Sequence, residues 1–235
     1  MKDKLVVILV EPEYGLNIGY VARTMKNFGI NKLYITGRRE IPKSAFRFSS
    51  HARDILEKAI LVDNFQDLMG EFDFIIGTTA RIATRSANII RKAIIPEEAV
   101  KFIHKFNKIA LVLGRDTIGL KNEELALCDI VVTIPTGTSY TTLNISHALA
   151  ILLYTFTKRM TGKRDMVPSK KERNQLITYV NSLMEEIGFP KYRRLRVIKT
   201  FNKIAISTEL RKEDMTTILG FFRRVLINLK RKGNH

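Results

Sequence analysis

Cysteine is almost missing from the sequence, which contains only Cys128 among its 235 residues. A single cysteine excludes a disulfide framework and is typical of a reducing cytoplasm, so we predict a cytoplasmic protein. Cys128 follows Leu125 and Leu127, and we expect it to be a buried structural thiol rather than a nucleophile. No apolar run approaches the ~18 residues of a membrane span, and the charged N-terminus does not fit a signal peptide. We therefore expect no membrane partner.

The sequence also lacks the common motifs for metals and phosphates. Its four histidines are scattered, and none pairs with Cys128 at ligand spacing, so we expect no metal. No Gly-x-Gly-x-x-Gly or Gly-x4-Gly-Lys-Ser/Thr segment follows the first apolar run. A flavodoxin-like nucleotide-binding module is the alternative interpretation of the fold. The absence of a conventional phosphate loop counts against it. No Gly-x-Ser-x-Gly turn of the serine hydrolases is present.

Acidic residues are scarce in the last third of the chain. Residues 158–235 contain 20 Lys and Arg against 7 Asp and Glu, a net charge of +13. Residues 1–157 contain 20 against 16, a net charge of +4, which together make the total of +17. A charge concentrated in one region favours a polyanionic partner, such as a nucleic acid, over a generally charged surface.

Apolar strands alternate with helical segments from Leu5 to about Lys158. Continuous apolar runs such as 5–10 and 109–113 are typical of strands buried in a parallel sheet. The pattern predicts an α/β fold with a parallel sheet of about six strands, flanked by helices that make right-handed crossovers.

Two local features of the first part of the chain give more detailed expectations. The helix after the first strand has one apolar face, and we predict Asn17 as its N-cap and Gly29 just past its end. The segment 38–50 is polar and basic, and we interpret it as an exposed loop.

The chain beyond Lys158 has a different organisation. We predict an α/β domain over 1–158, a basic linker over 159–173 and a helical domain over 174–235. Apolar residues at helical spacing indicate three short helices in the last domain. Because the polar faces of these helices are rich in Lys and Arg, we predict that this domain binds RNA.

Two strands in the middle of the chain each end in a polar loop. One loop begins at Gly114-Arg115-Asp116, and the other begins at Pro135 and leads through Tyr140 to Asn144. Open α/β sheets bind ligands at the carboxyl ends of their strands, so this is a candidate site. On pattern alone, two ordinary strand-to-helix turns remain an equal alternative.

Taken together, several motifs resemble one known family. They are Glu11-Pro12, Asn17-Ile18-Gly19, Arg23, Met25-Lys26, Gly77-Thr78-Thr79-Ala80-Arg81, Leu113-Gly114-Arg115-Asp116, Gly119-Leu120, Asn122-Glu123-Glu124-Leu125, Ile134-Pro135 and Tyr140-Thr141-Thr142-Leu143-Asn144. In this order and spacing they resemble the SPOUT class of S-adenosylmethionine-dependent RNA ribose 2′-O-methyltransferases, most closely the TrmJ family of tRNA methyltransferases. The stretches Arg194-Leu195-Arg196 and Ile218-Leu219-Gly220 resemble that family's C-terminal helical domain.

The resemblance implies a trefoil knot late in the α/β domain, a homodimer with shared active sites, and tRNA as partner. It implies S-adenosylmethionine as cofactor, bound by residues of four segments: Thr78, Thr79, Ala80, Gly114, Arg115, Ile134, Thr141, Thr142 and Leu143. It implies Arg23 as the catalytic residue that handles the ribose 2′-hydroxyl, with Asn17, Thr142 and Asn144 in support. A guanidinium is effectively always protonated, so Arg23 could be a base or an anchor for phosphate and developing oxyanion.

Two positions depart from the family pattern: Thr142 stands where the family usually has Ser, and Asp116 where it usually has Glu. Both changes preserve the functional group, so we expect an active tRNA 2′-O-methyltransferase that modifies nucleotide 32, the first of the anticodon loop. The alternatives are a 2′-O-methyltransferase for rRNA or another tRNA site, and a non-catalytic RNA-binding protein of the same fold.

Overall fold

The structure is a computed structural model that describes residues 4–80, 93–103, 105–158, 168–206 and 210–232. It divides into two compact units, Met1–Gly162 and Lys163–His235, and each is described here by itself.

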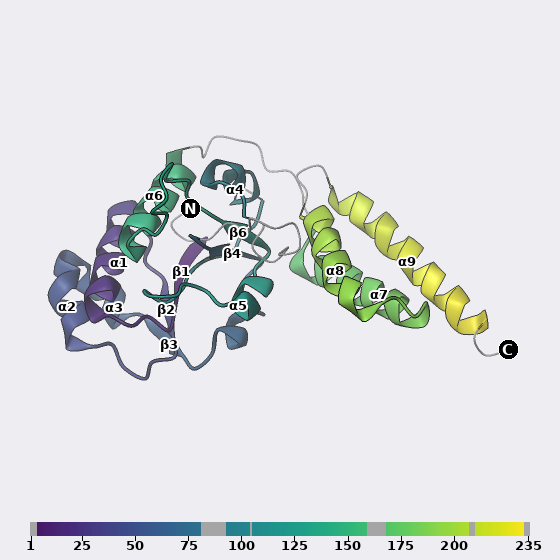
Figure 1. The fold of residues 1–235 in the computed structure, drawn as a ribbon, viewed down its shortest axis with the longest axis horizontal. Helices are drawn as coiled ribbons and strands as arrows, with labels where there is room; N and C mark the ends of the chain where they lie inside the picture. The colour runs from purple at the N-terminus through teal and green to yellow at the C-terminus, as the bar shows by residue number, and fades with distance from the viewer. Residues whose placement is uncertain (1–3, 81–92, 104, 159–167, 207–209, 233–235) are drawn as a thin grey trace. The chain divides into compact units, whose positions relative to one another are not determined.

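The first unit is built on one six-stranded sheet in which every pairing is parallel (Figure 1). The strands follow the spatial order β3-β2-β1-β5-β4-β6. Their bounds are β1 Leu5–Val10, β2 Leu33–Thr36, β3 Ile60–Val62, β4 Phe74–Thr78, β5 Ile109–Leu113 and β6 Ile130–Val132. The predicted parallel sheet of about six strands is thus confirmed.

Both faces of the sheet are covered, which explains why its strands are continuous apolar runs. β1 is buried at all six positions, and Val6, Ile8 and Val10 pack in one cluster with Leu125 and the buried thiol of Cys128. Helix α5 (Asn122–Ala126) supplies Leu125 to this face. Helices α1 (Gly15–Phe28) and α6 (Ile145–Lys158) lie together on the other side of the sheet, and α4 (Pro96–Ile103) packs against α6 (Figure 1).

The basic segment 38–50 is not the predicted exposed loop, because it contains helix α2 (Lys43–Ser49). The structure shows why: α2 packs closely against α1 at Gly15 and Gly19. A Cβ on Gly19 would lie 2.5 Å from the carbonyl oxygen of Ala45, so only glycine permits this approach. A short 3₁₀ turn, η1 (Ser50–Ala52), and helix α3 (Arg53–Glu57) follow, and a second turn, η2 (Phe65–Leu68), precedes β4.

The second unit consists, over its described residues, of α7 (Lys170–Glu186), α8 (Lys191–Ala205) and α9 (Lys212–Lys232). Their shared core contains Leu176, Val180, Met184, Ala205 and Met215. Ser169 and Glu172 form a reciprocal capping box at the start of α7, so this helix begins inside the segment that we predicted as linker. No helix in the described parts of the chain is both long and apolar enough to cross a membrane.

Candidate active site

A chain of three side chains joins the carboxyl end of β5 to the first turns of α1 and α6. Asn17 donates from Nδ2 to Oδ1 of Asp116 at 2.6 Å, and its own Oδ1 accepts from Nδ2 of Asn144 at 3.0 Å. Oδ1 of Asn144 accepts from the backbone N–H and the hydroxyl of Ser146, at 2.9 and 2.8 Å. Because each amide oxygen is occupied as an acceptor, the orientations of both amides are fixed.

Asn17 is therefore not the N-cap of α1 that we predicted. The helix begins at Gly15 after Tyr14, which makes no side-chain cap. The carboxylate of Asp116 instead fixes the segment that leads into the helix, because its Oδ2 accepts the backbone N–H groups of Glu13 at 2.8 Å and Tyr14 at 3.1 Å, the two residues before Gly15. The Asn17 side chain bonds to Asp116 and Asn144 at the site. Gly29 ends α1 in the left-handed region at φ 68°, as predicted.

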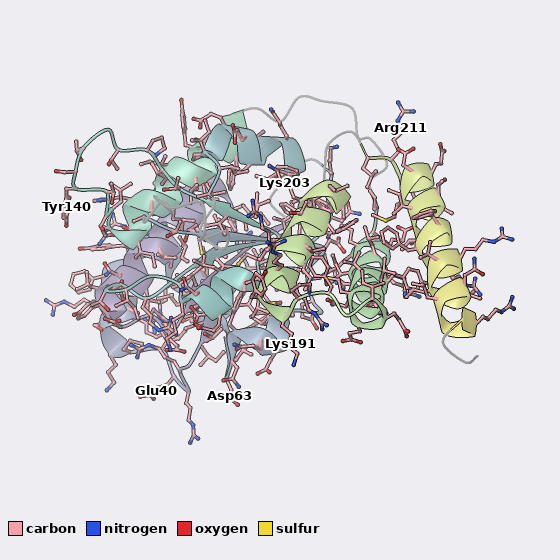
Figure 2. All side chains as sticks on the ribbon, turned by 45° about the vertical axis from the view of Figure 1, so that its right-hand side comes forward. Glu40, Asp63, Tyr140, Lys191, Lys203 and Arg211 are labelled. Atoms are coloured by element: carbon pink, nitrogen blue, oxygen red, sulfur yellow. The ribbon has the colours of Figure 1, made fainter. Side chains whose placement is uncertain are left out.

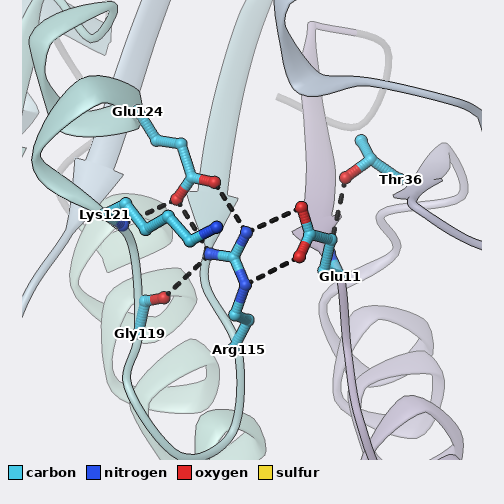
Figure 3. A network of polar contacts seen from close by, with 6 residues as sticks. All are labelled: Glu11, Thr36, Arg115, Gly119, Lys121 and Glu124. Carbon is cyan, nitrogen blue, oxygen red and sulfur yellow. Dashed lines mark hydrogen bonds and ion pairs between the residues drawn. The ribbon is translucent and has the colours of Figure 1, made fainter.

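The loop after β5 is held by the buried guanidinium of Arg115 (Figure 3). Glu124 receives two parallel bonds from it, at 3.0 Å from Nη1 and 2.9 Å from Nη2. Glu11 accepts a hydrogen bond from Nε at 2.9 Å and forms an ion pair with Nη2 at 2.7 Å, and the Gly119 carbonyl accepts from Nη1 at 3.4 Å. All three nitrogens of the Arg115 guanidinium thus contact oxygen atoms within the protein. The main role of the Arg115 side chain is therefore to shape the site.

The same network shifts the pKa values of its members. Burial alone would raise the pKa of the Glu124 carboxyl, but the hydrogen bonds from Arg115 and from the Lys121 backbone outweigh it and hold that pKa below its ordinary value. The hydrogen bonds that Arg115 donates to Glu124 and Glu11 raise the pKa of Arg115 despite its burial. Both groups are therefore charged at neutral pH, and they form a fixed ion pair that braces the β5 loop against α5.

Gly114 lies in close contact with the far end of its own loop. A Cβ on this residue would overlap the backbone of Gly119 and Leu120, so no side chain fits. The backbone of Arg115 pairs with that of Gly119 in both directions, at 3.2 and 3.0 Å, and Gly119 itself has φ 69°. The loop therefore folds back on itself and presents backbone to the space beyond it.

That space is a cleft at the carboxyl ends of β4, β5 and β6. It is lined by Asn17, Thr78, Thr79, Ala80, Leu113–Leu120, Val132, Ile134, Thr141–Ile145, Ala148 and Leu152. Every residue that we predicted for cofactor binding lies on this cleft, as do three of the four predicted catalytic residues. Arg81 of the same motif falls outside the described residues.

Arg23, the fourth, does not line the cleft. It is six residues beyond Asn17 on α1, which turns it roughly 120° around the helix at 100° per residue. It is exposed on the outer face of that helix. Within the described parts of this chain, Arg23 and the cleft thus face different directions.

Two residues of the site, Glu11 and Glu124, were not singled out from the sequence as functional. Both lie in motifs that carry the resemblance, but only the fold shows that they converge on Arg115. Glu11 adopts φ 46°, an uncommon conformation for a residue other than glycine, and its bonds to Arg115 hold it there. Among the described residues, no group of three or more metal-binding side chains is present.

Comparisons with known proteins agree with this fold and site. The sequence profile of the SpoU rRNA Methylase family matches residues 4–154, which is more than half of the chain and contains the whole cleft. TrmJ from Z. mobilis has a similar structure, with a TM-score of 0.69 at 23% identity over 94% of this chain and 98% of that one. The fold is therefore that of the SpoU methylases. The knot that the resemblance implies stays a prediction.

Two archaeal relatives are more informative about the subgroup. The tRNA (cytidine-2′-O-)-methyltransferase TrmJ of Methanocaldococcus jannaschii is 38% identical over 77% of this chain and 81% of its own. The protein of the same name from Sulfolobus acidocaldarius is 30% identical over 97% of this chain and 96% of its own. The chain therefore belongs to the SpoU methylase family and, within it, to the TrmJ proteins.

Proposed function

We propose that the chain is an S-adenosylmethionine-dependent tRNA ribose 2′-O-methyltransferase that modifies nucleotide 32 of the anticodon loop. One observation carries the proposal: the fold gathers Asn17 and the three strand-end loops into a single cleft within a SpoU methylase unit. The names of the archaeal relatives support the reaction class and favour cytidine as the modified nucleoside.

The residues of the cleft fit the proposed cofactor. Leu113, Leu120 and Leu152 offer an apolar surface for an adenine ring, and Thr79 and Thr142 offer polar groups. The absent side chain at Gly114 lets a ligand approach the loop backbone closely. A structural neighbour of the same fold, the SpoU methyltransferase AviRb from Streptomyces viridochromogenes, has been solved in complex with AdoMet. When bound, S-adenosylmethionine would supply an electrophilic methyl group on a sulfonium.

The protein must place a ribose hydroxyl in line with that methyl group and receive one proton. Asn17 donates one N–H of its amide to Asp116, and Asn144 donates one to Asn17, so each amide keeps one further N–H that it can direct at a ligand. Such donors suit the growing negative charge on the ribose oxygen. The Thr142 hydroxyl lies on the same cleft and can orient the attacking group.

Arg23 requires a second copy of the chain in this proposal, because it faces away from its own cleft. Apolar side chains are exposed nearby on α1 and α6: Leu16 at 39%, Ile151 at 40% and Tyr154 at 55%. Covering them in a two-fold dimer would remove this apolar surface from water. We therefore propose a homodimer in which Arg23 of one subunit completes the cleft of the other.

Methyl transfer to defined tRNA transcripts tests the proposal. Purified protein, S-adenosylmethionine and an unmodified tRNA with cytidine at position 32 should give one ribose methylation, mapped to that nucleotide by mass spectrometry. The control is the same tRNA with 2′-deoxycytidine at position 32, which lacks the acceptor oxygen and should receive no methyl group. Methylation elsewhere in tRNA or in rRNA would favour the alternative substrates, and cofactor binding without any transfer would favour a non-catalytic RNA-binding protein.

A further inference from the structure

Helix α8 has a charge distribution that does not stabilise the helix itself. Its 15 residues include six Lys or Arg and no Asp or Glu. Several of these cations are three or four residues apart, for example Arg193 with Arg196 and Lys199 with Lys203. Like charges at such spacing destabilise a helix. Three cations also occupy its first turn, where the helix dipole favours negative charge, and that turn contains no acidic residue. One of them, Arg194, lies 4.0 Å from the carboxylate of Glu185 on α7.

The other helices of the same unit are balanced in comparison. α7 carries three basic and three acidic residues. α9 is also basic, but it has Glu213 and Asp214 in its first turn, and three of its cations, 230–232, lie in its last turn. Both placements suit the dipole of a helix. The unfavourable arrangement is therefore confined to α8 among the described helices of this unit.

Three of the six cations of α8 lie in a line on one side of the helix. Tyr192, Arg196, Lys199 and Lys203 follow one another at i, i+4, i+7 and i+11, so they share one face, here called the α8 stripe. The stripe spans about 16 Å at 1.5 Å per residue. Figure 2 labels Lys191 and Lys203 at the two ends of the helix. Tyr192, Arg196 and Lys203 are exposed, and Lys199 between them is half-buried, so the stripe is open to a large partner at three of its four positions.

An aromatic ring lies at the first position of the stripe. Tyr192 is 80% exposed, and the guanidinium of its neighbour Arg193 lies over the ring, 5.4 Å from the centroid. A ring this exposed contributes little to the packing of the helices. A ring with adjacent cations is the platform on which proteins stack an unpaired base beside its phosphates.

We propose that the α8 stripe binds the phosphate backbone of single-stranded or loop RNA and that Tyr192 stacks on one unpaired base. This inference rests on the proposed function for its substrate class, and it assigns the RNA contact of the second unit to one helix and one ring. Backbone charge provides affinity for any RNA, and the ring adds a preference for unpaired nucleotides.

Equilibrium binding of tRNA to full-length protein, measured at several salt concentrations, tests the inference. Arg196→Gln with Lys203→Gln should reduce the slope of log affinity against log salt by about two, because each lost phosphate contact removes about one. Tyr192→Ala should weaken binding about tenfold without changing the slope, and Tyr192→Phe should restore it. The matched control is Arg223→Gln with Arg224→Gln on α9, which removes the same charge and should change the slope less.

Two results would overturn the proposal: an unchanged slope for the α8 pair, or an equal effect from the α9 pair. Circular dichroism of each variant establishes that the helices are intact. The readout is binding rather than turnover, so the two proposals fail separately. A protein that binds tRNA through α8 without methylating it would refute the proposed function alone. Normal methylation with an unchanged half-saturating tRNA concentration in the α8 pair would refute only this inference.

Discussion

Asp116 and Asn17 are 99 residues apart in the sequence, and their side chains share a hydrogen bond of 2.6 Å. The same carboxylate accepts the backbone N–H groups of Glu13 and Tyr14, the two residues before α1. A single residue of the β5 loop therefore fixes both the start of a helix and the amide that faces the cleft. The chain has Asp here instead of the Glu that we associate with its family, and the shorter carboxylate still reaches all three donors.

Replacing Asp116 with Ala should affect stability and chemistry together. The variant removes the acceptor for the backbone N–H groups of Glu13 and Tyr14, which costs about 1 kcal/mol, and releases the Asn17 amide. We expect a kcat at least tenfold lower with a smaller change in cofactor affinity. Thermal unfolding and single-turnover methyl transfer measure the two effects. Asp116→Glu should recover most of the activity, and a fully active Asp116→Ala would mean that the amide needs no fixed orientation.

Gly114→Ala should destroy the cleft, because its Cβ has no space against the backbone of Gly119 and Leu120. We expect loss of S-adenosylmethionine binding by calorimetry together with lower thermal stability. Gly70→Ala is a matched control, since Gly70 is exposed and a Cβ there would meet nothing within 4 Å. If Gly114→Ala bound the cofactor normally, the β5 loop would not be its binding surface.

Glu124→Gln should destabilise the first unit by about 3 kcal/mol at pH 7, because it leaves Arg115 short of a buried anionic partner. The pKa of Glu124 is lower in the folded protein than in the unfolded chain. Its contribution is thus complete above the ordinary Glu pKa and is lost as pH falls through the folded value. Urea unfolding at neutral and acidic pH should show that the difference in the free energy of unfolding between wild type and variant becomes smaller at acidic pH. A difference that does not depend on pH would contradict the charged pair.

Arg23→Ala should abolish methyl transfer while cofactor affinity stays close to that of wild type. Arg23→Lys keeps the charge but loses the planar fork, so its activity separates a simple charge effect from a guanidinium-specific role. Arg53→Ala is the control, because Arg53 is an exposed arginine that pairs with Glu57 at 2.8 Å outside the cleft.

Mixing two inactive variants tests whether Arg23 acts on the partner's cleft. If it does, re-associated Arg23→Ala and Thr142→Ala subunits should recover about a quarter of wild-type activity, since half of the dimers are mixed and each holds one intact site. No recovery in mixed dimers would place Arg23 in the cleft of its own subunit.

Sequence patterns predicted the parts of the fold that depend on local periodicity. The buried strands and the three helices of the second unit follow from apolar spacing, and the end of α1 follows from Gly29. Helix α2 was missed because its identity as a helix depends on a distant partner: the flat surface at Gly15 and Gly19 of α1. Its own sequence is basic and gives only a weak apolar face.

The sequence predicted which residues line the site, but it did not predict the hydrogen bonds between them. The loops that line the cleft could be predicted because they contain the motifs that carry the resemblance. The contact of Asp116 with the segment before α1 could not be predicted, since Asn17 is itself a good N-cap residue and Asp116 is far away in the chain. The same holds for Glu11 and Glu124, whose meeting at Arg115 depends on β1 and β5 being neighbours.

The position of β5 in the sheet has a consequence for how the protein is made. β5 lies between β1 and β4, and β4 pairs only with β5 and β6 among the described strands. A nascent chain that ends before Ile109 can pair β1, β2 and β3, but β4 has no partner and one edge of β1 remains open. Open strand edges are the surfaces through which incomplete chains associate. During synthesis, the sheet therefore cannot be completed by the first hundred residues until β5 has been made.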